Sequence, residues 1–180
     1  MKANFIFNPF EKIAGLSALL IGIGMMLTTG LLAGYTGAHF PDFISTLISV
    51  TTGWYVPLVE ILFIWAVLSI LGMLACQIGG SSNYRIIDVM GTIALSRAPY
   101  LLAVLAGFIS SLEVSPKTLQ LIVFPIHLAV IGWSLALLYH ALKVSGNLKG
   151  KSLWISFTIV CIGTQLITML LMNKLYLFIL

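Results

Sequence analysis

Five long apolar stretches, separated by short segments that carry most of the charge, are the feature that most constrains this chain. A membrane hydrocarbon core about 30 Å thick is crossed by roughly 20 apolar residues of α-helix. Stretches of about that length lie near residues 13–34, 54–76, 93–112, 118–142 and 153–173. They lack the strict alternation of polar and apolar residues that a transmembrane β-barrel requires. The pattern predicts an all-α polytopic membrane protein, a bundle of five transmembrane helices.

The composition favours a single membrane domain over residues 1–180. Hydrophobic residues make up 60% of the chain and mean hydropathy is +1.11, far above the level of soluble domains. The five spans leave too few residues for a soluble domain. The net charge of +4 belongs to loops beside the membrane and is not a nucleic-acid signal. The first span is too long for a cleaved signal peptide, and no simple basic leader precedes it.

The basic residues predict the orientation of the bundle. Five crossings that start inside place seven of the nine lysines and arginines on the inner side. Only Lys117 and Lys174 fall on the outer side. Because cytoplasmic loops carry an excess of basic residues, this asymmetry predicts an N-terminus inside and a C-terminus outside.

The third span is short, and the segments near it suggest surface helices. Only 14 residues run from Pro99 to Leu112, so the span is expected to begin near Ile93, with Arg97 reaching the inner headgroups. Apolar residues share one helical face in 83–96, which predicts a helix lying in the inner interface. A similar pattern in 41–50 predicts a second surface-lying helix on the outer side.

Small residues mark the faces along which the helices are expected to pack. Ala14, Ala18, Gly22, Gly30 and Gly34 follow an i, i+4 spacing in the first span, interrupted only by Met26. Small residues let helix backbones approach closely in lipid, so this stripe predicts a packing seam, within the bundle or in a homo-oligomer. The alternative is that glycine and alanine are simply common in membrane helices. Cys76 and Cys161 lie inside apolar stretches and are expected to be free thiols.

Four segments, in order along the chain, resemble the Yip domain family (Ypt/Rab-interacting proteins), especially its short prokaryotic members. They are the Asn-Pro entry in 7–13, the Gly-Gly turn and basic stretch in 79–85, the proline-containing 94–100, and the fourth span with its basic loop in 133–151. The resemblance implies a five-helix membrane domain with a cytoplasmic N-terminus and a non-enzymatic role in membrane organisation.

The resemblance does not carry over every property of the family. Eukaryotic members have a sizeable cytosolic N-terminal region and an Asp-Leu-Tyr-Gly-Pro motif, and this sequence has neither. A GTPase partner is therefore not expected, although eukaryotic members bind Rab-type GTPases. The bacterial inner (cytoplasmic) membrane is the expected location.

Ionisable residues inside the spans are the candidates for a site, because such residues are costly in lipid. Glu60, His127 and Gln165 fall at similar depth in the outer halves of the second, fourth and fifth spans. Pro57 and Pro125 lie just before Glu60 and His127, and each is expected to break its helix and free an upstream carbonyl.

Two interpretations of these residues stay open. They could line a polar cavity that binds a cation, a proton or a lipid headgroup. Alternatively, Glu60 could be protonated, or bonded to His127, and merely lock two helices together. No metal site, cofactor motif or catalytic pair is found in the sequence, so an enzyme is not expected.

A basic collar on the inner side completes the candidates. Its members are Arg85, Arg97, Lys143, Lys149 and Lys151. They are expected to contact anionic membrane lipids, or else only to set the orientation. The sequence thus predicts a non-enzymatic membrane scaffold. The alternatives are a small transporter or channel using the Glu60 and His127 layer, and a lipid-handling protein.

Overall fold

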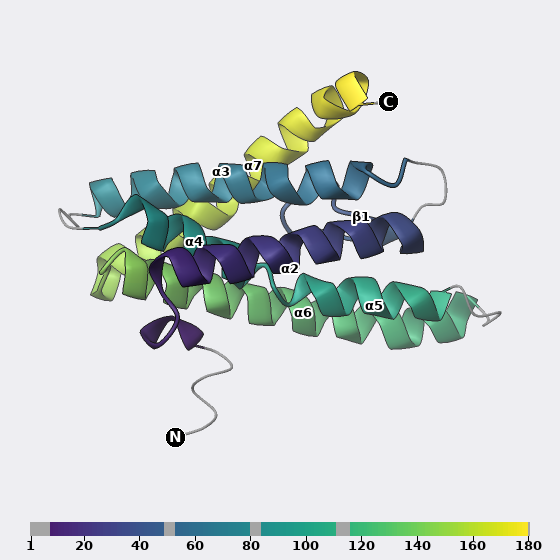
Figure 1. Cartoon of the computed structure of the whole chain (residues 1–180), viewed down its shortest axis with the longest axis horizontal. Coiled ribbons are helices and arrows are strands. Elements are labelled where there is room, and N and C mark those ends of the chain that lie inside the picture. Colours follow the sequence, from purple (N-terminus) through teal and green to yellow (C-terminus); the bar gives the residue numbers. More distant parts are fainter. Residues whose placement is uncertain (1–7, 49–52, 80–83, 111–115, 180) are drawn as a thin grey trace.

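The computed structural model describes residues 8–48, 53–79, 84–110 and 116–179. The elements, in chain order, are η1 (Pro9–Glu11), α2 (Gly15–Thr36), β1 (Ala38–His39), β2 (Leu47–Ile48), α3 (Val56–Ile78), α4 (Ile86–Ser96), α5 (Tyr100–Ser110), α6 (Pro116–Ser145) and α7 (Gly150–Ile179). Figure 1 shows α2, α3, α5 and α6 running side by side along the long axis, with α7 crossing them obliquely.

The prediction of an all-α bundle is confirmed. Five helical segments are long and apolar enough to cross a membrane. They are Gly15–Thr36, Val56–Ile78, Ile86–Phe108, Leu121–Ser145 and Gly150–Leu177. The chain enters and leaves the bundle at opposite ends (Figure 1), as an odd number of crossings requires. We name the end where α2 begins the inner end, and the end where α3 begins the outer end, following the predicted orientation.

The small-residue stripe of α2 is a packing seam inside the bundle. A Cβ added to Gly22 would lie 2.6 Å from the Ala94 Cβ of α4, and one added to Gly30 would lie 2.8 Å from the Leu58 Cα of α3. Ala18 on the same stripe is fully buried, and so is the neighbouring Ala33. Because glycine has no side chain, α2 approaches both α4 and α3 closely, as the glycine and alanine spacing predicted.

The third span is longer than the sequence indicated, and it is broken. The apolar span begins at Ile86, and α4 and α5 are separated at residues 97–99. The predicted interfacial helix in 83–96 is wrong, because most of α4 is buried against α2. A Cβ on Gly91 would lie 2.7 Å from the Leu19 backbone nitrogen, so α4 packs too closely on α2 to lie on the membrane surface.

The predicted outer surface helix in 41–50 is also wrong over its described residues. Residues 37–48 form a re-entrant loop, in which β1 and β2 pair antiparallel and Ala38 lies opposite Ile48. Gly37 turns the chain back with a φ of 67°, a left-handed conformation that glycine adopts without strain. Phe40 and Phe43 are buried in the bundle, so tertiary packing overrode the helical pattern.

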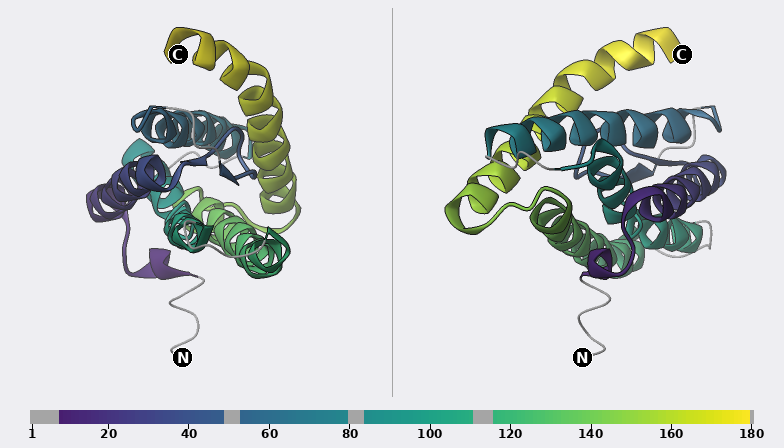
Figure 2. Two further views of the ribbon diagram at one scale, coloured as in Figure 1. Left: turned by 90° about the vertical axis from the view of Figure 1, so that its right-hand side faces the viewer. Right: turned by 60° about the vertical axis from the view of Figure 1, so that its left-hand side comes forward.

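The last helix, α7, leans away from the other spans. It packs chiefly on α3 and more weakly on α6. Both views in Figure 2 show its C-terminal half rising away from the bundle. The described contacts of α7 with the re-entrant loop come from a few side chains near the outer end, such as Thr168.

Candidate functional site

Glu60 is the centre of a buried polar cluster near the outer end. It lies four residues after Val56, about 6 Å along α3, and is 0% exposed. Its Oε2 accepts a 2.6 Å hydrogen bond from the Phe40 backbone N–H. Its Oε1 accepts a 2.6 Å bond from the Tyr176 hydroxyl and lies 3.2 Å from the His39 Nδ1. Glu60 therefore joins α3 to the re-entrant loop and to α7.

A second buried charge holds the same loop from the other side. Arg97 is 1% exposed, and its Nη1 donates a 3.1 Å hydrogen bond to the Phe43 carbonyl. The Tyr100 hydroxyl donates to the same carbonyl at 3.0 Å. The guanidinium lies 3.7 Å from the centroid of the Tyr100 ring, within the range of a cation–π contact. Arg97 Nε and Nη2 have no hydrogen-bond partner among the described residues.

These side chains form hydrogen bonds with backbone N–H and C=O groups of the re-entrant loop that are not paired in a helix or sheet. Non-helical backbone at membrane depth is tolerated only where protein groups or water satisfy its N–H and C=O groups. Here Glu60 accepts from the Phe40 N–H, Thr168 Oγ1 accepts from the Phe43 N–H at 3.3 Å, and Arg97 and Tyr100 donate to the Phe43 carbonyl. We call these four side chains the loop clamp: Glu60, Arg97, Tyr100 and Thr168.

Asp42 fixes the tip of the re-entrant loop by local bonds. Its Oδ1 accepts from the backbone N–H groups of Ile44 at 2.9 Å and Ser45 at 2.7 Å. Burial raises the pKa of Asp42, but hydrogen bonds from Ser45, Ile44 and Gln165 outweigh that effect and leave it below its usual value. Because an aspartate that bonds the backbone two residues on favours a turn over a helix, Asp42 explains why 41–50 is not helical.

The predicted layer of Glu60, His127 and Gln165 forms only in part. Gln165 lies close enough to Asp42 to help lower its pKa, and so reaches the same loop as Glu60. His127 instead places its Nδ1 3.3 Å from the carbonyl of Val123, within its own helix. The predicted bond between Glu60 and His127 is wrong, because His39, Phe40 and Tyr176 occupy the carboxylate. The physical reason is that α3 packs chiefly on α7, α2 and α4, whereas α6 packs on α4 and α5.

Neither of the two predicted helix breaks is present, since α6 runs without interruption from Pro116 to Ser145. Pro125 lies inside α6, so it removes one helical hydrogen bond there. Pro57 lies in the first turn of α3 and breaks nothing, because the N–H that proline lacks is unsatisfied at that position in any helix. The Gly53 carbonyl is not freed either, since it accepts from the Val56 N–H.

Sequence reasoning missed several residues of the cluster. His39 was not among the candidates, and Arg97 was expected to reach the inner headgroups. Both are buried, and Arg97 lies midway along the span from Ile86 to Phe108. The sequence did contain one signal for Arg97: if residues 86–108 had been taken as a single span, Arg97 would have fallen at membrane mid-depth. No local signal pointed to Tyr176.

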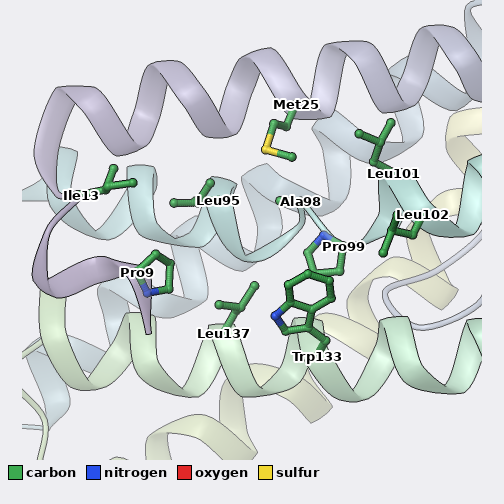
Figure 3. Close-up of a pocket in the computed structure, with 10 residues that line it drawn as sticks. All are labelled: Pro9, Ile13, Met25, Leu95, Ala98, Pro99, Leu101, Leu102, Trp133 and Leu137. Atoms are coloured by element: carbon green, nitrogen blue, oxygen red, sulfur yellow. The ribbon is translucent and has the colours of Figure 1, made fainter. Parts of the chain in front are cut away.

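The break in the third span also borders an apolar groove. Arg97 faces the re-entrant loop, whereas the next two residues line the groove (Figure 3). The groove encloses about 420 Å³. Its lining residues are Pro9, Ile13, Met25, Leu95, Ala98, Pro99, Leu101, Leu102, Trp133 and Leu137. The groove lies in the inner half of the bundle, on the side of η1 and α6.

The predicted basic collar forms without Arg97. Arg85, Lys143, Lys149 and Lys151 are exposed near the inner ends of α4, α6 and α7. Lys12 is exposed at the same end, beside η1. Arg97 cannot contact lipid headgroups because its guanidinium is buried on Phe43 and Tyr100. Among the described residues, no group of three or more His, Cys, Asp or Glu could hold a metal ion.

Comparison with known proteins adds no identity. No family model matches the chain, and neither a curated protein nor a solved structure matches it. The resemblance to the Yip domain family therefore stays a prediction from the sequence. The structure describes an all-α bundle whose five apolar helices are consistent with an integral membrane protein.

Proposed function

We propose that this protein is a non-enzymatic membrane scaffold that acts through its basic inner surface and through self-association. The observation that carries this proposal is the loop clamp. The buried carboxylate of Glu60 accepts from the Phe40 N–H and the Tyr176 hydroxyl, and its Oε1 also lies 3.2 Å from the His39 ring. A group so engaged serves to hold the re-entrant loop and has little capacity left to bind a passing solute.

The distribution of exposed charge supports the same conclusion. Four of the five collar residues, together with Lys12, are exposed at the inner end. Juxtamembrane cations of this kind are each attracted to an anionic leaflet by about 1 kcal/mol. The inner end is thus the surface through which the bundle would act on the membrane. Membership of the Yip family and a bacterial inner-membrane location belong to this proposal and are supported by the four resembling segments.

Reconstitution into liposomes tests the proposal. Copies labelled at Lys174→Cys with donor or acceptor dyes should show more energy transfer in anionic than in zwitterionic liposomes. The labels are placed in a variant without Cys76 and Cys161, so that only residue 174 reacts. Lys149→Gln with Lys151→Gln should reduce the difference, because it neutralises two exposed collar residues. Energy transfer equal to that of randomly distributed copies in both lipids would contradict self-association.

A small transporter is the second candidate, and one observation favours it. The third span is discontinuous, and a buried arginine with two donors unpartnered among the described residues lies at its break. Transporters place substrate and ion sites at such breaks. The liposomes above distinguish the two: dissipation of a proton gradient that Glu60→Gln abolishes would favour transport. The scaffold proposal expects the same slow leak as in empty liposomes.

A further inference from the structure

The apolar groove beside the break has the depth of one membrane leaflet. Its walls come from η1, α2, the third span and α6 (Figure 3). Its lining runs from Ile13, just before α2, to Met25 within that helix. Met25 lies ten residues, or about 15 Å, from the start of α2 at Gly15. Half of a hydrocarbon core about 30 Å thick is also about 15 Å. The groove therefore spans the inner leaflet and ends at mid-depth, where Pro99 interrupts the third span.

The groove opens toward the lipid-facing surface of the bundle. Leu102 on its wall is 45% exposed, and Met25 and Trp133 are partly exposed. Its volume of about 420 Å³ lies within the range of small-ligand sites. The short η1 helix bounds the groove at the inner end and the α4–α5 break bounds it at mid-depth.

Charged side chains gather where the groove reaches the inner end. Lys12 is exposed next to the wall residue Ile13, and Lys143 is exposed in the last turn of α6. Glu11 is the acidic residue there, and its Oε1 accepts a 2.9 Å hydrogen bond from Asn8. His140 interacts electrostatically with both Lys143 and Glu11, so the end of α6 and η1 face each other. Asp88 lies at the same end, with its Oδ1 3.1 Å from where a Cβ on Gly15 would stand, and exposed Arg85 precedes α4. Three basic residues (Lys12, Arg85 and Lys143) against two acidic ones (Glu11 and Asp88) favour an anion at this mouth.

From these features we propose that the groove binds one phospholipid of the inner leaflet, with an acyl chain along α2 and the phosphate beside Lys12 and Lys143. Apolar walls match the chain, and the cationic mouth matches the phosphate and favours an anionic headgroup. The inference deepens the proposed scaffold function by naming its lipid ligand. Lipid binding is measured without any assay of self-association, so either proposal can fail while the other stands.

Lipid retention by the purified full chain tests the site. Native mass spectrometry after extraction into a mild detergent, with a 1:1 mixture of phosphatidylglycerol and phosphatidylcholine added, should show one retained phospholipid per chain. Ala98→Phe fills the groove and should lower retention at least tenfold. Ala129→Phe adds the same side chain to an exposed position of α6 outside the groove and should retain lipid normally. Lys12→Gln should reduce the preference for phosphatidylglycerol about fivefold.

Tryptophan fluorescence gives a second readout that does not depend on the groove-filling variant. Brominated phosphatidylglycerol in liposomes should quench Trp133, which lines the groove, at a lower mole fraction than brominated phosphatidylcholine. Trp133→Phe should remove this anionic preference, and Trp154→Phe, which changes an exposed residue of α7, should keep it. Equal retention by Ala98→Phe and Ala129→Phe, or quenching that Trp133→Phe leaves unchanged, would overturn the proposal.

Discussion

At the scale of single residues, the two buried charged side chains form hydrogen bonds with opposite ends of one short backbone segment, from Phe40 to Phe43. A carboxylate only accepts hydrogen bonds and a guanidinium only donates them. Glu60 accordingly binds the N–H of Phe40, and Arg97 binds the carbonyl of Phe43. Each charge is costly at membrane depth. Each is retained with a backbone group of the complementary polarity, and the Phe43 carbonyl also accepts from the Tyr100 hydroxyl.

Double-mutant cycles should separate the true partner of Glu60 from the one suggested by sequence. Combining Glu60→Gln with His39→Ala should give a coupling free energy of about 0.6 kcal/mol or more, the average for intramembrane hydrogen bonds. Combining it with His127→Ala should be additive within about 0.5 kcal/mol, since the two residues share no hydrogen bond. Unfolding in mixed micelles measures both cycles. Coupling to His127 that exceeds the coupling to His39 would contradict the observed geometry.

Replacement of Glu60 by alanine should cost more than replacement by glutamine. Alanine leaves the buried Phe40 N–H without an acceptor, a loss of about 1–3 kcal/mol. Glutamine keeps a carbonyl oxygen at the site and can still accept one of the bonds. Equal free energies of unfolding for the two variants, measured in the same micelles, would exclude a structural role for the Phe40 bond.

Asp42 should make the stability of the loop depend on pH in the acidic range. Hydrogen bonds hold its folded pKa below the unfolded value of about 3.9. A group of this kind contributes stability at pH values above its unfolded pKa, and that contribution disappears as the pH falls through the folded pKa. Thermal unfolding of the wild type between pH 6 and pH 3 should therefore show a fall in Tm that Asp42→Asn reduces. An identical fall in both proteins would show that other groups cause it.

At the scale of elements, the break in the third span and the re-entrant loop depend on each other. The loop enters the bundle where α4 ends, so that Arg97 at the break can reach the Phe43 carbonyl. The break itself is stabilised by short-range bonds, since the Arg97 and Ala98 N–H groups donate to carbonyls three residues back. The Ser96 carbonyl accepts from the Ser134 hydroxyl at 2.8 Å. A discontinuous helix is thus tolerated because neighbouring elements satisfy its backbone.

Two glycines of α2 provide a matched test of the seam. A Cβ on Gly22 would clash with Ala94 at 2.6 Å, whereas one on Gly24 would meet nothing within 4 Å. Gly22→Ala should therefore destabilise the bundle by about 1–3 kcal/mol, the usual cost of overpacking. Gly24→Ala should leave the free energy of unfolding unchanged or raise it by up to about 1 kcal/mol through helix propensity. Equal effects would mean that α2 and α4 do not pack as described.

At the scale of the whole molecule, the bundle has a tightly packed side and a loosely packed one. The third span is mostly buried, whereas α6 and α7 expose most of their length. Exposed apolar residues are expected on helices that face lipid. The core is centred on α2, α3 and α4, receives buried side chains from α5, α6 and α7 as well, and includes Phe40 and Phe43 of the re-entrant loop.

Cysteine labelling should establish the orientation. In a variant without Cys76 and Cys161, a membrane-impermeant thiol reagent added to intact cells should label Lys174→Cys. It should label Lys149→Cys only after the membrane is permeabilised. Both positions are exposed, so access depends on the side of the membrane alone. Labelling of both residues from the same side would show that α7 does not cross the membrane and would contradict the five-span bundle.

The sequence by itself determined the number, approximate bounds and class of the spanning helices. Each depends on apolar length, which any helix in lipid must satisfy through its own residues. The stripe of small residues from Ala18 to Gly34 likewise predicted a seam, because its spacing is a property of one helix. Glu60 was identified as a candidate for the same reason, since a charge within an apolar stretch is visible without a partner.

Only the tertiary structure decided where the buried charges point and what they bind. Glu60 bonds His39, Phe40 and Tyr176, which lie 21, 20 and 116 residues away along the chain. Arg97 bonds Phe43 from 54 residues away. Helical periodicity places a side chain on a face of its own helix but does not say which helix lies opposite. The re-entrant loop was hidden for the same reason: Phe40 and Phe43 fit a surface helix equally well until a bundle exists to bury them.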